Sequence, residues 1–218
     1  MIYLTGVSNP TIRAWASTRT DVGLMAQPRS AVLGHAADYS AGYAFDNGAF
    51  GAFLRGTPFD VPAWERQLAK LPDGLCRFVV VPDVVGNHDG TRASWDLHAG
   101  TVHTTGRPAA FVLQNGCTDL SQVPNNADAV FIGGDDTYKL GADAARVGWQ
   151  ARGHGLWVHM GRVNSASRFC RALAMGCDSA DGTFLRFGPV QQQIDRVTAW
   201  LNTGRDSGGQ LDLTERVA

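Results

Sequence analysis

The stretch FVVVPDVVG, residues 78–86, indicates the fold more clearly than any other part of the sequence. Phe78 to Val81 are apolar without interruption, so they do not alternate as a strand with one solvated face would. A short, wholly apolar run of this kind is typical of a strand buried on both faces of a parallel sheet. Proline ends the run, and an aspartate and a glycine follow it, as in the loop after a strand.

The same pattern recurs along the chain. Further short apolar runs end at turn residues: Ile2 to Leu4, Val22 to Ala26, Tyr43 to Phe45, Ala110 to Leu113, Ala129 to Ile132, Leu156 to Met160 and a short one at Cys177. Between most of them lie helix-like stretches, the clearest being Pro62 to Lys70, Gly90 to Thr104, Gly141 to Arg152 and Asn164 to Met175. In the last of these, Asn164 is expected to cap the helix and Gly176 to end it.

Eight strand-and-helix units in 218 residues predict an α/β protein with a compact (β/α)₈ barrel. A doubly wound open sheet is the alternative. No linker or composition shift divides the chain, so we expect one domain over residues 1–202, closed by a helix from Val190 to Leu201. The polar, glycine-rich residues 203–218 are expected to form a flexible tail.

Composition and charge narrow the classes of protein. With 44% hydrophobic and 18% charged residues, and no run near the roughly 18 apolar residues of a membrane helix, a membrane protein is excluded. The 19 basic and 20 acidic residues create no global field that would attract nucleic acid, so a polyanion would need a local patch. The four cysteines form no CxxC pair and no secretion signal begins the sequence, which favours a cytoplasmic protein, in the host cytoplasm if the source is viral.

Polar residues and glycines follow many of the expected strands. In a parallel architecture the site lies at the carboxyl ends of the strands, so these residues are the candidates for function. They are Asp46 in FDNGAF, Asp83, Gln114 in FVLQNG, Gly133 and Gly134 in VFIGGDD, Met160 in VHMGR, and Asp178 and Asp181 in GCDSADGT. Each aspartate alone could be a turn former, but the whole set at strand ends favours a site.

These segments resemble the motifs of one enzyme family. FDNGAF is similar to the DSGGF motif of tRNA-guanine transglycosylases and their DNA-modifying relatives. Five further features follow in the family's order. They are an aspartate after a strand, LQNG where the family has VQGG, a GG after a strand, a Met-Gly, and GCDSADG where the family has GxDxFD. The resemblance spans roughly Tyr43 to Thr183.

The resemblance implies catalytic roles for three aspartates. Base exchange at C1′ passes through an oxocarbenium-like centre, which a carboxylate can attack while a second group handles the base's proton. By resemblance Asp181 is the nucleophile and Asp46 the acid/base group, with Asp178 the competing nucleophile.

The resemblance also implies how the base is bound. A guanine-like edge needs a carboxylate for its N–H donors and amide donors for its O6, which Asp83, Gln114 and the N–H groups of Gly133 and Gly134 supply. Phe50 and Met160 are expected to sandwich the base, although both could equally be core residues.

Other residues concern metal and phosphate. The family's zinc cluster has no counterpart after Gly188, and His88, His98 and His103 lack metal-ligand spacing, so neither a metal nor another cofactor is expected. The family's Cys two residues beyond the base-binding aspartate is Val85 here, which leaves the base specificity open. Lys139, Arg162 and Arg168 are candidates for phosphate contacts, with solvated helix faces as the alternative.

The resemblance therefore implies a pentosyltransferase of the guanine transglycosylase type. By its similarity to the short DNA-modifying members of viruses and mobile elements, it is expected to replace guanine in DNA with a 7-deazaguanine such as preQ0, and tRNA is the alternative polymer. An enzyme that hydrolyses a small nucleoside with the same carboxylates is a further alternative, and a non-catalytic base-binding protein is disfavoured. A basic rim around the pocket would favour a polymer, and an acidic one a small substrate.

Overall fold

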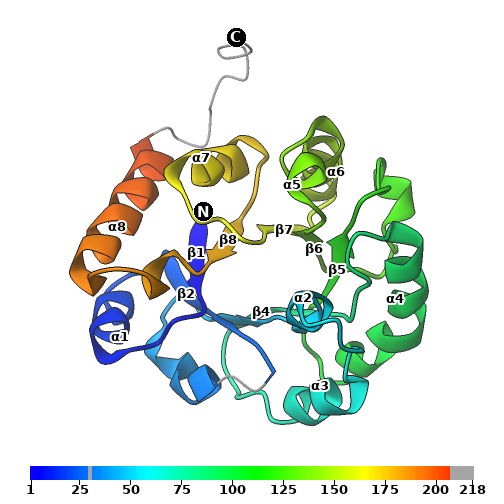
Figure 1. Cartoon of the computed structure of the whole chain (residues 1–218), viewed down its shortest axis with the longest axis horizontal. Coiled ribbons are helices and arrows are strands. Elements are labelled where there is room, and N and C mark those ends of the chain that lie inside the picture. Colours follow the sequence, from blue (N-terminus) through cyan, green and yellow to red (C-terminus); the bar gives the residue numbers. More distant parts are fainter. Residues whose placement is uncertain (29–30, 207–218) are drawn as a thin grey trace.

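The computed structural model describes residues 1–28 and 31–206. These form a closed barrel of eight parallel strands in sequence order, with β8 pairing back onto β1 (Figure 1). The strands are β1 Ile2–Thr5, β2 Val22–Ala26, β3 Tyr43–Phe45, β4 Cys76–Val80, β5 Ala109–Leu113, β6 Ala129–Ile132, β7 Trp157–Met160 and β8 Ser179–Gly182. The predicted (β/α)₈ barrel is confirmed, and the open sheet is excluded.

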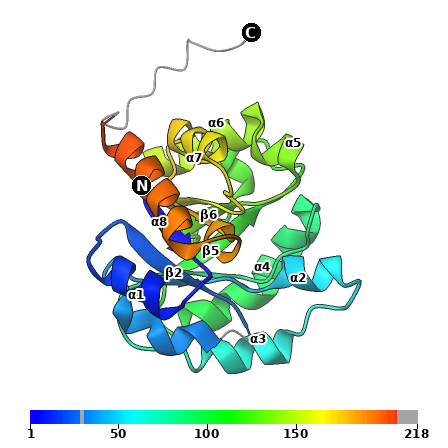
Figure 2. The ribbon, with the colours of Figure 1, turned by 60° about the vertical axis from the view of Figure 1, so that its left-hand side comes forward.

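Helices form a ring outside the barrel (Figure 1). The α-helices are α1 Pro10–Ser17, α2 Ala49–Leu54, α3 Val61–Leu68, α4 His88–His103, α5 Asp136–Lys139, α6 Ala142–Gly153, α7 Ala166–Ala174 and α8 Val190–Asp206. Three 3₁₀ helices are η1 Ala31–Asp38, η2 Leu120–Gln122 and η3 Phe184–Arg186. The short helix α2 follows β3 almost at once and projects from one end of the barrel instead of joining the outer ring (Figure 2).

Apolar side chains fill two layers. One cluster lies inside the barrel and includes Leu4, Phe78 and Val80, and a larger one lies between the strands and the outer helices. Successive residues of a strand point to opposite faces, so neighbours on one strand join different clusters. On β7, Trp157 packs against the inner cluster, whereas Met160 belongs to the outer one.

Helix α7 shows how local sequence positions a loop of the barrel. Ser165, and not Asn164, caps this helix, its Oγ accepting a hydrogen bond from the backbone N–H of Arg168 at 3.3 Å. Asn164 instead accepts one from the N–H of Thr183 at 2.7 Å, tying the loop after β7 to the end of β8. Gly176, at φ +73°, follows the end of the helix as predicted.

Two boundaries differ from the sequence-based expectation. The last strand is Ser179–Gly182 and not a run at Cys177, because its residues are small or polar and do not stand out by hydropathy. Helix α8 continues to Asp206, past the expected domain boundary at 202. The remainder of the expected tail, 207–218, lies outside the described residues.

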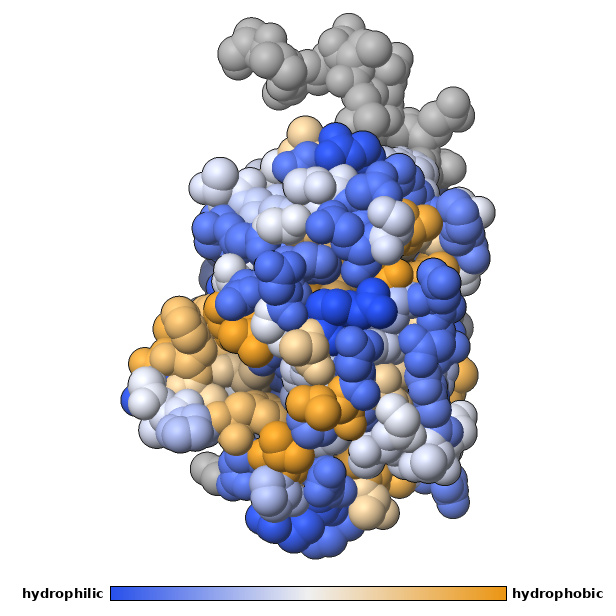
Figure 3. Space-filling view, turned by 90° about the vertical axis from the view of Figure 1, so that its right-hand side faces the viewer, coloured by the Kyte–Doolittle hydropathy of each residue, from blue (hydrophilic) through white to orange (hydrophobic). Residues whose placement is uncertain are grey.

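The face that carries α4 is mostly hydrophilic, with hydrophobic patches in its lower half (Figure 3). Leu97 of α4 and Val84, before it, are exposed, as are Phe53 and Leu54 of the projecting α2. Among residues 1–28 and 31–206, no helix is both long and apolar enough to cross a membrane.

Candidate active site

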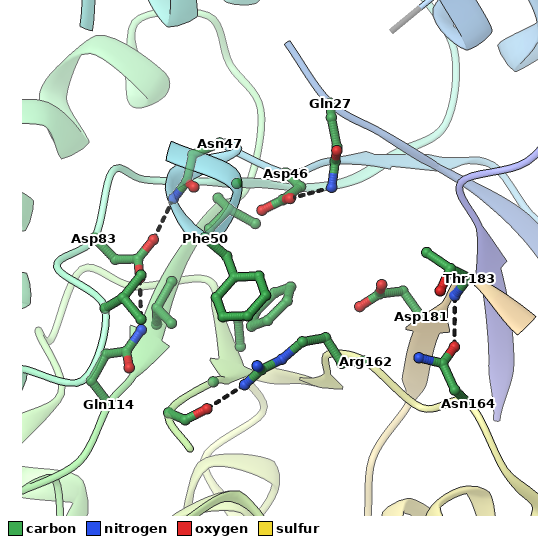
Figure 4. Close-up of a pocket in the computed structure, with 18 residues that line it drawn as sticks. Gln27, Asp46, Asn47, Phe50, Asp83, Gln114, Arg162, Asn164, Asp181 and Thr183 are labelled. Carbon is green, nitrogen blue, oxygen red and sulfur yellow. Dashed lines mark hydrogen bonds between the residues drawn. The ribbon is translucent and has the colours of Figure 1, made fainter. Parts of the chain in front are cut away.

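A cavity of about 430 Å³ opens at the carboxyl ends of the strands. This is where (β/α)₈ enzymes carry their catalytic residues, and the volume suits a small planar ligand. The cavity brings together most of the residues predicted for the site: Asp46, Phe50, Asp83, Gln114, Gly133, Gly134, Arg162 and Asp181 (Figure 4). Met160, Asp178, Lys139 and Arg168 do not line it.

Asp83 and Gln114 form a fixed hydrogen-bonded pair on one side of the cavity. Asp83 accepts from Asn47 Nδ2 at Oδ1 and from Gln114 Nε2 at Oδ2, both at 2.7 Å (Figure 4). The N–H of Gly86 donates to Gln114 Oε1 at 2.8 Å, so the amide nitrogen must face Asp83. Burial raises the pKa of Asp83, against the lowering effect of its two amide donors. The pair thus presents carboxylate oxygens and one remaining amide N–H to a ligand.

Of the two glycines after β6, only Gly134 has a free amide. The N–H of Gly133 donates to Leu113 O at 3.0 Å in the barrel ladder, so it cannot serve a ligand as expected. The N–H of Gly134, at φ +74°, has no acceptor within the described part of the chain. Gly133 has a packing role, because a Cβ there would lie 2.8 Å from Val112 Cγ1 and 3.3 Å from Gln114 Nε2.

Asp46, directly after β3, is held ready to carry a proton. Gln27 Nε2 donates to its Oδ2 at 2.8 Å. Burial, then the negative charges of Asp181 and Asp83, raise the pKa of Asp46 to about 7. Near neutral pH the group therefore exists in both protonation states, as a general acid and base requires. Gln27 was not predicted, although it too follows a strand end directly.

Asp181 and Asp178 lie at opposite ends of β8. Asp181 lies within the strand, lines the cavity and points toward its centre (Figure 4). Asp178 precedes the strand, where it accepts from Arg152 Nη1 at 2.7 Å and from the N–H of Val158 at 2.9 Å. Asp178 therefore ties β7 and α6 to the amino-terminal end of the barrel and is remote from the candidate site.

His159 is a site residue that the sequence reasoning missed. It lies on β7, fully buried inside the barrel, with Nε2 3.0 Å from Asp181 Oδ1 and Nδ1 2.8 Å from Ser179 Oγ. Its ring packs against Phe78 and Phe131, with centroids 5.0 and 4.6 Å away. One signal could have pointed to it: His159 is the one polar residue of β7, and the two-residue period places it on the same face as Trp157.

The expected sandwich of Phe50 and Met160 does not form. Met160 is fully buried in the outer core, because it is an outward-facing residue of β7. Phe50 lines the cavity, and the guanidinium of Arg162 lies 4.3 Å from its ring centroid. Arg162 has φ +62°, unusual for a residue with a Cβ, and donates to the carbonyl oxygen of Gly134. The planar group that faces Phe50 is thus Arg162.

The other two predicted phosphate contacts are engaged in an ion-pair network. Lys139 Nζ lies 3.3 Å from Asp136 Oδ1, and Arg168 Nη2 lies 2.5 Å from Asp136 Oδ2. The Lys139 side chain is almost fully buried, and burial lowers its pKa. Neither side chain reaches the cavity, so Arg162 is the one cation among the described lining residues, against three carboxylates.

The histidines considered as metal ligands lie apart. His98 packs edge-on against Trp64, and His103 lies 3.6 Å from Asp128. Across residues 1–28 and 31–206, no group of three or more His, Cys, Asp or Glu side chains could hold a metal ion.

Comparison with known proteins supports the fold alone. No protein-family model matches the chain, and no curated protein matches it. Solved structures do: one described as native KDPGal shares 11% identity at a TM-score of 0.54, covering 96% of this chain and 95% of that one. A porous, cube-shaped protein cage designed by fusing symmetric oligomeric domains shares 12% identity at a TM-score of 0.52, covering 95% of this chain and 72% of that one. A mandelate oxidase mutant with a monooxide FMN adduct shares 12% identity at a TM-score of 0.51, covering 91% of this chain and 69% of that one. At these identities the likeness is one of barrel architecture.

Proposed function

We propose that the protein is an enzyme that exchanges a purine base at C1′ of a nucleotide through a covalent aspartyl intermediate. The observation that carries the proposal is a single cavity that Asp181 lines from the side opposite the Asp83–Gln114 pair, with Asp46 between them (Figure 4). Two carboxylates in different environments suit a nucleophile and an acid, and the fixed amide–carboxylate pair matches the edge of a guanine. The motif resemblance around these residues is independent support.

The exchange balances with these two carboxylates. Asp181 attacks C1′, the C1′–N9 bond breaks, and the departing guanine takes the bond's electron pair and the proton of Asp46. The incoming base then attacks C1′ through N9, gives its N9 proton to Asp46, and the C1′–O bond returns its electron pair to Asp181. Asp46 ends protonated, as it began, which its pKa of about 7 permits near neutral pH.

The proposed substrates are guanine in DNA and an incoming 7-deazaguanine, with tRNA as the second polymer. The target base must leave its stack to reach Asp181, which costs a few kcal/mol. Arg162 at the cavity is the described side chain best placed for a phosphate.

A second candidate is an enzyme acting on a free nucleoside. The specific observation that favours it is the lining charge, since three carboxylates accompany a single arginine among the described residues. Such a mouth repels a polyanion more than it attracts one. The same Asp181 and Asp46 would then deliver water to the sugar.

The deciding experiment incubates the protein with radiolabelled guanine or a labelled 7-deazaguanine, together with duplex DNA, tRNA or deoxyguanosine in separate reactions. Label entering DNA supports the leading proposal, and label entering tRNA indicates that tRNA is the polymer substrate instead. Base released from deoxyguanosine without incorporation into a polymer favours the second candidate. The variant D181N should be inactive throughout, and no reaction in any arm would refute both.

A further inference from the structure

Beneath the nucleophile candidate lies a chain of buried hydrogen bonds that base exchange does not by itself require. Trp157 Nε1 lies 2.8 Å from Ser179 Oγ, Ser179 Oγ lies 2.8 Å from His159 Nδ1, and His159 Nε2 lies 3.0 Å from Asp181 Oδ1. Ser179 and His159 are fully buried, while the Asp181 side chain is 20% exposed, to the cavity. The chain thus runs from the barrel interior to the candidate site.

The direction of this chain follows from the donors available. An indole N–H can only donate, so Ser179 Oγ accepts from Trp157. The one hydroxyl proton of Ser179 is then directed to His159 Nδ1, the remaining polar atom that it contacts among the described residues. With Nδ1 accepting, the imidazole proton resides on Nε2 and is donated to Asp181.

We propose that His159 is a positioning residue for Asp181, locked as its Nε2–H tautomer by Ser179 and Trp157, and that it holds one carboxylate oxygen while the other faces the cavity. Its part in turnover rests on the proposed function. Serine, histidine and aspartate also make up the triad of many hydrolases, but here the serine is sealed in the core and the carboxylate is the member that reaches the cavity.

The inferred role has a direction in the exchange reaction. The N–H of His159 stabilises negative charge on Asp181 most when that carboxylate is free, and least when it is esterified to C1′. The donor therefore aids the second half of the exchange, when the C1′–O bond breaks and the charge returns. Loss of the donor should slow breakdown of the covalent adduct more than its formation.

The surroundings of His159 leave few other influences on it. Its ring faces Phe78 from β4 and Phe131 from β6, and Asp181 is the one titratable side chain that it contacts among the described residues. Asp46 and Tyr3 act on the pair only through their electrostatic interaction with Asp181. A change at His159 thus reports on Asp181 directly.

The first test measures adduct formation and breakdown separately, in single turnovers of the full chain with the polymer or nucleoside that reacts. In H159F, which keeps the aromatic packing but has no donor, breakdown should slow roughly 10- to 100-fold, as for loss of a hydrogen bond to a charge. H159Q, whose amide can donate to Asp181, should recover part of the rate. M25A, in the same inner cluster but outside the cavity lining, is the matched control for damage to the barrel interior, and its ratio of breakdown to formation should stay that of the wild type. An unchanged ratio in folded H159F would overturn the role in turnover.

The second test needs no substrate and separates this inference from the proposed function. In ¹⁵N-histidine-labelled protein, with H159Q identifying the resonances, NMR should place the His159 proton on Nε2 and leave Nδ1 bare. In S179A the Nδ1 resonance should shift, because that nitrogen loses its donor while Asp181 still accepts from Nε2, and this variant serves if H159F does not fold. A proton on Nδ1 of the wild-type protein would overturn the proposed chain. Wild-type protein that forms no adduct would overturn the proposed function, and the NMR result would still decide the tautomer.

Discussion

Asp46 and Asp181 share one cavity, and the charge of Asp181 helps to raise the pKa of Asp46 to about 7. In the proposed exchange Asp46 must be protonated when the first base departs, so we expect the rate with nucleic acid to fall as pH rises above about 7. The measurement is kcat/KM against pH from about 5 to 9. A rate that keeps rising through this range would show that Asp46 is not the acid.

The raised pKa of Asp46 should also make the stability of the folded chain depend on pH. The folded-state pKa of Asp46 lies above its ordinary value of 3.8, so the folded chain binds the proton more tightly. Its stabilising contribution is complete below about pH 4 and is lost as pH rises through about 7. D46N, which cannot ionise, should therefore unfold roughly 5 to 15 °C higher than wild type at pH 8, with the difference shrinking towards pH 4. Thermal melts at both pH values check this, and an unchanged difference would contradict it.

Substitution of Asp181 should affect catalysis, and substitution of Asp178 should affect stability. D181N should abolish the covalent adduct with little loss of stability. D178N should still form the adduct but unfold more easily by about 1 to 2 kcal/mol, because the ion pair with Arg152 and the bond from the Val158 N–H are weakened. Adduct trapping on denaturing gels and urea unfolding measure the two effects. An adduct that survives in D181N and vanishes in D178N would reverse the assignment.

Removal of Asn47 should weaken base recognition without touching the nucleophile. Asn47 supports Asp83 through a 2.7 Å hydrogen bond, and N47A leaves that oxygen without its partner. We expect KM for the incoming base to rise roughly 5- to 150-fold, the range for 1 to 3 kcal/mol. Q191A, which removes an exposed amide on α8, is the control and should leave KM unchanged. An N47A enzyme with wild-type KM would show that Asp83 needs no support.

Arg162 offers a test of the polymer hypothesis. It is the described cation at the cavity, so R162A should raise KM for DNA or tRNA several-fold while free base binds as well or better to the uncovered face of Phe50. R168A removes the same charge from a side chain already paired with Asp136. It should change the KM for the polymer and the affinity for the free base much less than R162A does. Equal effects of the two substitutions would indicate a diffuse electrostatic influence.

The barrel was predictable because seven of its strands are apolar runs in the sequence, buried on both faces. The same property hid the orientation of side chains on β7, since Trp157, Val158 and Met160 are all apolar and His159 is the one polar residue of the strand. Met160 was consequently assigned to the cavity and His159 overlooked, whereas in the structure Met160 lies in the outer core and His159 contacts Asp181 from inside the barrel.

The candidate site was predictable where a polar residue follows a strand directly, as for Asp46 and Gln114, or within three residues, as for Asp83. It was not predictable where the role depends on distant partners. The N–H of Gly133 is consumed by Leu113, and Lys139 and Arg168 are occupied by Asp136, and none of these pairings has a signal in the local sequence. Strand β8, with Ser179 and Asp181 facing inward, is the least apolar strand and was misplaced for that reason.

Two carboxylates flank the short strand β8: Asp178, just before it, lies at the amino-terminal end of the barrel, and Asp181, within it, lines the cavity at the carboxyl-terminal end. Attempts to make this protein more robust could therefore begin among the loops around Asp178 and Arg152, which lie at the far end of the strands from the cavity. Changes of substrate would be sought among the loops around Asp181. Substitutions that raise stability and substitutions that change the substrate would thus lie at opposite ends of one short strand, so the two kinds of change can be made independently.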